Sequence, residues 1–195
     1  MHAVRWTMLG AAALALAGCG SKTENHTTDT VVTTGNADGG AMVTPDAAAP
    51  AAASAGQSFA NAAAASDAFE IASSQMAQAQ ASGASVKKFA GAMIKAHTDS
   101  TAKLKTAAAA SSPAITPDPT LSPTQQQKLD TMKALNGAAF DTAYAAAQVE
   151  AHQQTLDALK ANAANQQLPQ PLRDFATQLI PTVTAHLNMA KALAK

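Results

Sequence analysis

A repeated helical pattern constrains the fold of this chain more than any other feature. Between residues 86 and 104 apolar side chains recur every three or four residues, which places them on one stripe of an α-helix; they are Val86, Phe89, Ala90, Met93, Ile94 and Leu104. The segment from Leu172 to Leu193 repeats the pattern, including a Phe-Ala pair. His97 and His186 occupy matching positions on the two stripes, where a helix used only for packing would carry Leu. The sequence therefore predicts two helical hairpins, each with a histidine directed into a shared core.

The composition agrees with a single all-α domain. The chain has 195 residues, with 13 Lys and Arg against 13 Asp and Glu, and a formal net charge of zero. Alanine, the strongest helix former, dominates the sequence, and the β-branched alternation that a sheet needs is absent. The lack of a basic cluster argues against nucleic-acid binding. The chain has one cysteine, so it cannot form an intrachain disulfide.

Residues 1–18 have the features of a signal peptide. Arg5 supplies the positive charge, and the apolar run over residues 9–17 is too short to cross a bilayer. Residues 16–19 read Leu-Ala-Gly-Cys and resemble the bacterial lipobox. That resemblance implies that Cys19 receives a lipid and that cleavage occurs before it. The alternative is an ordinary signal peptide followed by a cysteine that is there by chance.

The lipidated cysteine and a disordered tether are predicted over residues 19–57. This segment is rich in Thr, Ala, Gly, Pro and Asp and shows no apolar period, so it cannot offset its conformational entropy by burial. Gly20 follows the cysteine, and by resemblance to enterobacterial sorting the absence of Asp there favours the outer membrane. We therefore expect a protein of the bacterial cell envelope, held on the membrane by lipid and facing the periplasm.

The helical domain is predicted over residues 58–195. Long helices are expected over residues 58–81, 85–110, 138–164 and 172–194. A short helix over 124–135 should lie in the connection between the second and third long helices, because Ser122 and Gln125 form a capping-box pattern. Four prolines make the preceding segment extended; they are Pro113, Pro117, Pro119 and Pro123. The sequence thus predicts an antiparallel arrangement of four long helices with one additional short helix.

Each predicted long helix carries one polar residue near its middle, namely Glu70, His97, His152 and His186. Glu70 lies 13 residues before Gly83 and His97 lies 14 residues after it, so the two are level in an antiparallel hairpin. The other two histidines are level within a turn. Imidazole and carboxylate ligands suit zinc, iron, manganese or copper, so the four residues predict a site for one transition-metal ion.

Two alternatives to a plain nitrogen and oxygen site remain open. Met93 and Met189 are spaced to share a face with His97 and His186, so their thioethers would favour copper(I) if they joined the site. They would otherwise fill the core. The histidines themselves could be core hydrogen-bonding groups with no metal, since a buried histidine often has that role.

Three segments of the chain resemble a known family. They read VKKFAGAMIKAH from residue 86, FDTAYAAAQVEAHQQTL from residue 140 and LRDFATQLIPTVTAHL from residue 172. They are similar to the ferritin-like family called domain of unknown function 4142 (DUF4142), over about residues 58–195. The resemblance implies a ferritin-like antiparallel four-helix bundle in the bacterial envelope, without an established enzymatic activity.

The chain departs from its relatives at three positions. Members of the family usually carry Asp immediately before the helix-two histidine, where this chain has Ala96. The wider ferritin superfamily uses Glu-x-x-His on two helices, but here Ile94 and Val183 stand three residues before the histidines. A ferritin-type di-iron centre and iron storage are therefore not expected.

The leading functional prediction is a lipid-anchored helical protein that binds one transition metal in envelope stress or metal handling. The alternative is a non-catalytic structural or partner-binding envelope protein whose histidines are core hydrogen-bonding groups, with an unknown protein as its partner. An oxidase-like metalloenzyme is a third reading, and it would require an open coordination position and a route for substrate. No catalytic residue is predicted, because the sequence contains no nucleophile triad, phosphate-binding glycine loop or paired-cysteine motif.

Overall fold

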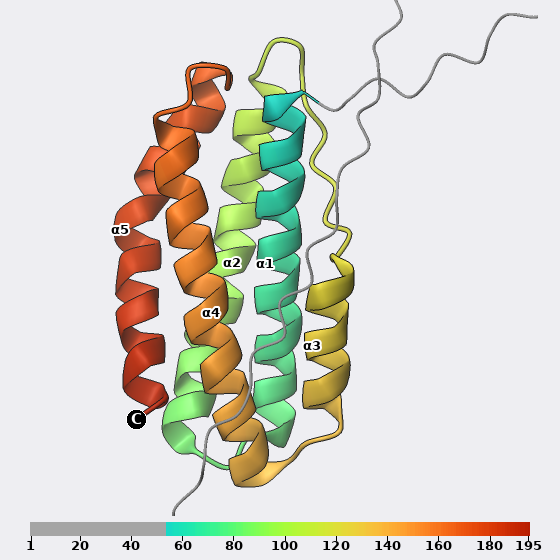
Figure 1. Cartoon of the computed structure of the whole chain (residues 1–195), viewed down its shortest axis with the longest axis vertical. Helices are drawn as coiled ribbons and strands as arrows, with labels where there is room; N and C mark the ends of the chain where they lie inside the picture. Colours follow the sequence, from blue (N-terminus) through green and yellow to red (C-terminus); the bar gives the residue numbers. More distant parts are fainter. Residues whose placement is uncertain (1–53) are drawn as a thin grey trace, which may run out of the picture. The chain divides into compact units, whose positions relative to one another are not determined.

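The computed structural model describes residues 54–195, which form five helices and no strand (Figure 1). The all-helical prediction is therefore confirmed for this part of the chain. The predicted signal peptide, Cys19 and residues 19–53 of the predicted tether lie outside the described residues. None of the described helices is long and apolar enough to span a membrane.

The helix boundaries agree with the predicted ones to within three residues. The helices are α1 (Ala55–Gln80), α2 (Ala84–Ala109), α3 (Pro123–Lys133), α4 (Gly137–Ala163) and α5 (Gln170–Leu193). The largest difference is at the start of α1, which begins at residue 55 rather than 58. Ser54 explains it, because its hydroxyl accepts a hydrogen bond from the Gln57 backbone N–H at 3.1 Å and so caps the helix.

The short helix α3 begins with the predicted capping box. The Ser122 hydroxyl accepts from the Gln125 backbone N–H at 3.2 Å, and the Gln125 side chain accepts from the Ser122 backbone N–H at 2.9 Å. At the start of α4 the chain turns at Gly137, whose φ of 61° lies in the left-handed region that glycine adopts without strain.

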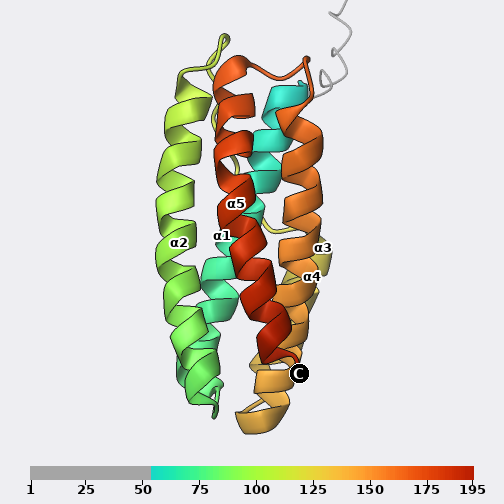
Figure 2. The ribbon, with the colours of Figure 1, turned by 90° about the vertical axis from the view of Figure 1, so that its left-hand side faces the viewer.

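The four long helices lie side by side, as both ribbon views show (Figure 1 and Figure 2). Helix α1 packs against α2 and α4, while α5 packs against α4 and α2. Helix α3 lies outside these four and contacts α1 and α4. The short loops over residues 81–83 and 164–169 make α1 run antiparallel to α2, and α4 antiparallel to α5.

The apolar core is divided into two clusters along the helices. One contains Phe59, Leu104, Leu156 and Phe175 with their neighbours. The other contains Phe69, Phe89, Met93, Phe140 and Tyr144 with theirs. In α2 and α4 the buried polar residues fall between these clusters along the helix, and in α1 and α5 they lie next to the change from one cluster to the other. A polar cluster therefore interrupts the hydrophobic core near its middle.

Candidate metal centre

The structure brings the four predicted residues together, one from each long helix. Glu70 of α1, His97 of α2, His152 of α4 and His186 of α5 are 2%, 6%, 2% and 9% exposed. The centroids of the three imidazole rings lie 5.5–6.0 Å apart, and one ring nitrogen from each lies within 4.8 Å of the others. Glu70 joins them through an oxygen 3.6 Å from Nδ1 of His152. Below, these four residues are called the histidine cluster.

Hydrogen bonds determine the tautomers of two of the histidines. Nδ1 of His97 lies 2.8 Å from Oδ1 of Asp67, and Nδ1 of His152 lies 2.9 Å from the backbone carbonyl of Gln148. A carboxylate and a carbonyl only accept hydrogen bonds, so Nδ1 carries the proton in both rings. Nε2 of each ring consequently keeps its lone pair in the neutral form, and that lone pair is the one a metal uses.

Five buried side-chain polar atoms have no hydrogen-bond partner among the described residues. One is Oε1 of Gln148, and the other four come one from each long helix and are of types that bind metals. These four atoms are Oε2 of Glu70, Nε2 of His97, Nε2 of His152 and Nδ1 of His186. A buried polar atom without a partner costs about 1–3 kcal/mol. Close packing of a core does not require unpartnered polar atoms, so packing alone does not explain four of them, all of metal-binding types, in one place.

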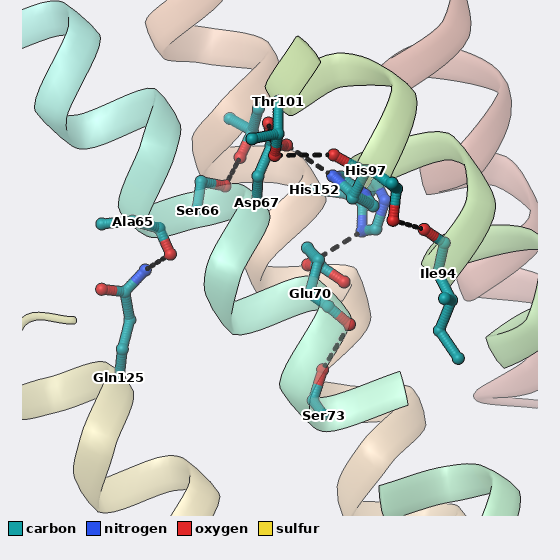
Figure 3. Close-up of polar contacts among 12 residues, drawn as sticks. Ala65, Ser66, Asp67, Glu70, Ser73, Ile94, His97, Thr101, Gln125 and His152 are labelled. Atoms are coloured by element: carbon teal, nitrogen blue, oxygen red, sulfur yellow. Dashed lines mark hydrogen bonds and ion pairs between the residues drawn. The ribbon is translucent and has the colours of Figure 1, made fainter. Parts of the chain in front are cut away.

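Asp67 is a member of the site that the sequence predictions omitted. It lies one turn before Glu70 on α1, is 5% exposed, and points with Glu70 toward the histidines (Figure 3). Its second oxygen lies 3.2 Å from the Thr101 hydroxyl, which is also 2.9 Å from the His97 carbonyl and can donate to either. The signal was present as two carboxylates three residues apart, a spacing that places both on one helix face.

The pKa of the Glu70 carboxyl group lies close to neutral pH. Burial raises its pKa from the ordinary value of 4.5 to about 7, although the nearby His97 charge and a hydrogen bond from Gln148 oppose the increase. The group is thus divided between its protonated and ionised forms at neutral pH. A cation bound beside it would favour the ionised form.

The histidines divide into two electrostatic types. Burial, followed by the charge of His97, lowers the pKa of His152 and of His186 to about 4, so both rings are neutral at pH 7. Burial also acts to lower the pKa of His97, but the hydrogen bond to Asp67 and the charges of Glu70 and Asp67 raise it overall. Two of the three imidazoles are therefore already in the protonation state that a metal requires.

A packed polar layer closes the cluster on the side toward the α1–α2 loop. The Gln148 amide donates to the Ser73 hydroxyl at 3.2 Å, and the Ser74 and Tyr144 hydroxyls lie 2.8 Å apart. Phe89 packs against the His152 ring with the centroids 6.3 Å apart. This layer excludes water from one side of the site.

The methionines take different positions. Met93 is fully buried in the apolar cluster next to this layer, as its core-filling interpretation predicted. Met189 is 44% exposed, so it does not share the buried environment of His186. The donors in the buried cluster are consequently nitrogen and oxygen.

The donor set fits one ion better than two. Both carboxylates, Asp67 and Glu70, come from α1, whereas Ile94 and Val183 occupy the positions where a Glu-x-x-His motif would add a carboxylate on α2 and α5. Three nitrogens around a zinc-like ion would lie roughly 3.4 Å apart, given metal–nitrogen distances of about 2.1 Å. The imidazole nitrogens, now within 4.8 Å of one another, would therefore have to approach by up to about 1.4 Å, a movement on the scale of side-chain rotations.

Comparison with known proteins gives one family. The family described as "Domain of unknown function (DUF4142)" matches residues 41–193, which is more than half of the chain. No curated protein and no solved structure matches.

Proposed function

Because the chain belongs to the DUF4142 family, whose description names no activity, we propose a function from the histidine cluster itself. The protein binds one transition-metal ion between the long helices of a ferritin-like antiparallel four-helix bundle. The ligands are His97, His152, His186 and Glu70. Zinc, iron, manganese and copper all accept such a set of three imidazoles and one carboxylate.

A single observation supports this proposal most strongly. Each of the four long helices supplies one buried metal-ligand atom without a hydrogen-bond partner among the described residues. An ion bound by these atoms would remove four unfavourable terms at once and would join the helices to one another. A purely structural cluster would be expected to satisfy its own polar atoms.

The protonation states of three of the four ligands also support binding at neutral pH, whereas the raised pKa of His97 opposes it. His152 and His186 are neutral there, since their pKa values are lowered to about 4, and Glu70 loses its proton easily because its pKa is about 7. Asp67 fixes His97 with Nε2 directed away from the Asp67 hydrogen bond. Such a carboxylate partner typically strengthens binding by orienting the ring and raising its basicity.

We also propose that the protein is a lipoprotein of the bacterial envelope, anchored through Cys19 and facing the periplasm, with the outer membrane as its site. The support is the short apolar run that ends in Leu-Ala-Gly-Cys. In that location a metal-binding bundle would act in metal handling or in envelope stress.

The test compares metal binding by the purified protein and two variants. Elemental analysis of protein isolated from its native membrane identifies the ion. Titration of chelator-treated protein with zinc, copper(I), iron(II) and manganese(II) should then raise the melting temperature. An ion present at 100 times its dissociation constant stabilises the native state by about 2.7 kcal/mol.

His97→Ala should abolish this metal-dependent stabilisation, while His26→Ala, a histidine outside the described residues, should leave it unchanged. If no metal raises the melting temperature of the wild-type protein in a His97-dependent way, the metal-binding proposal is wrong. The histidines would then be structural hydrogen-bonding groups, and a partner-binding role would replace metal binding.

A further inference from the structure

A small pocket reaches the histidine cluster from the side opposite the packed polar layer. Its volume is about 40 Å³, and its wall includes the side chains of His97, His186 and Asp67. His152 and Glu70 are absent from the wall. A water molecule needs roughly 10–15 Å³ of such volume, so the pocket holds about three waters or one ligand of two or three heavy atoms.

The pocket lies on one side of the cluster along the helices. Apart from the histidines themselves, its α1 residues precede Glu70, its α4 residues follow His152 and its α5 residues precede His186. On α2 it is lined by Ala96 and Ser100, on either side of His97. Phe175, Leu179 and Val183 supply an apolar wall, whereas Ser100, one turn after His97, supplies a hydroxyl. Small ligands that accept hydrogen bonds suit such a mixed surface, and larger molecules do not fit the volume.

The wall residues differ in exposure, which points to an entry between α2 and α5. The half-buried Ala96 of α2 and the exposed Thr182 of α5 both line it. Between α1 and α4, by contrast, the Ser66 and Thr155 hydroxyls lie 3.0 Å apart and link the two helices across the pocket wall. Thr182 is the only exposed residue of this wall, so an entry past Ala96 and Thr182 is part of the proposal below. The four unpartnered ligand atoms themselves are buried.

We propose that the bound metal keeps one coordination position open toward this pocket, and that a hydrogen-bond-accepting ligand of two or three heavy atoms enters there past Ala96 and Thr182. This inference rests on the proposed metal site and adds a second ligand to it. The protein supplies ligands from all four long helices, but only the side opposite the packed polar layer admits an additional molecule. With its four protein ligands the ion would become five-coordinate when such a molecule binds, a coordination number that catalytic zinc sites also reach.

The experiment uses cobalt(II) as the metal and azide as the probe. Cobalt(II) reports its own binding through its visible absorption, and azide changes that spectrum when it enters the coordination sphere. The wild-type protein should bind cobalt(II) and then show a saturable spectral change with azide.

Two substitutions narrow the opening. Ala96→Phe places a large side chain at the mouth on α2, and Thr182→Met does so on α5. Each should retain cobalt(II) and weaken azide binding at least tenfold. Ala92→Phe is the matched control, because Ala92 is exposed on α2 one turn away and does not line the pocket. It should behave as the wild type does. If Ala96→Phe does not fold, Thr182→Met still tests the route.

The outcomes separate the two proposals. If the wild type fails to bind cobalt(II) or any of the other metals, the proposed function itself is wrong. If it binds cobalt(II) but azide leaves the spectrum unchanged, the metal site stands and the open position is refuted. Equal azide affinity in the wild type, Ala96→Phe and Thr182→Met would refute entry through this pocket.

Discussion

Replacing Glu70 with Gln should stabilise the metal-free protein, and the gain should increase with pH. The pKa of Glu70 is about 7 in the folded protein against an ordinary value of 4.5. Folding therefore favours the protonated carboxyl group, whose contribution is fully present below pH 4.5 and is lost as pH rises through 7. At about 1.36 kcal/mol per pH unit, the difference corresponds to roughly 3 kcal/mol. Gln is neutral at every pH and avoids this loss.

The assay is denaturant unfolding of chelator-treated protein between pH 4.5 and 8. Glu70→Gln should match the wild type to within about 1 kcal/mol at pH 4.5 and exceed it by about 3 kcal/mol at pH 8, or about 10 °C in melting temperature. The control is Glu150→Gln, since the Glu150 side chain is 50% exposed and paired with Lys128 at 2.7 Å. A stability difference that does not change with pH would refute the burial argument for Glu70.

Three further predictions address other parts of the molecule. Asp67→Asn should weaken metal binding about 10- to 100-fold in a competition titration with a coloured chelator, because His97 loses its charged partner; unchanged affinity would contradict this. Phe89→Ala should cost about 3–5 kcal/mol in unfolding free energy, since the ring is 6% exposed and packs against Tyr144 and His152; a cost below about 1 kcal/mol would place it outside the core. Cys19→Ser should abolish metabolic palmitate labelling, and labelling equal to the wild type would exclude the lipid anchor.

Helical periodicity predicts that the four residues of the histidine cluster meet, although it did not identify Asp67. The spacing of three and four residues assigned His97, His152 and His186 to inward stripes, and all three are buried in one cluster. Counting from the loops placed Glu70 at their level, and its carboxylate lies 3.6 Å from His152. These features follow from the rise and pitch of a helix alone, so a single sequence contains them.

The hydrogen bonds around the cluster depend on features that periodicity does not contain. Asp67 accepts from His97 because of how α1 is rotated about its axis and shifted along α2. Both quantities differ from one helix pair to another by enough to move two side chains out of hydrogen-bonding distance. The pocket is the space that the side chains of four helices leave unfilled. Its volume depends on how all four helices pack, so it cannot be predicted from any one segment of the sequence.

The position of the cluster connects stability with function. It separates two apolar clusters, and at this point the core contains a carboxyl group and three imidazoles rather than close-packed hydrocarbon. Such a core is less stable without an ion than a hydrophobic replacement would be, because its buried polar atoms lack partners. Glu70→Gln would relieve part of that cost and at the same time remove a ligand. A variant that gains stability in chelator and loses stabilisation by metal would therefore show that the cluster is retained for binding rather than for folding.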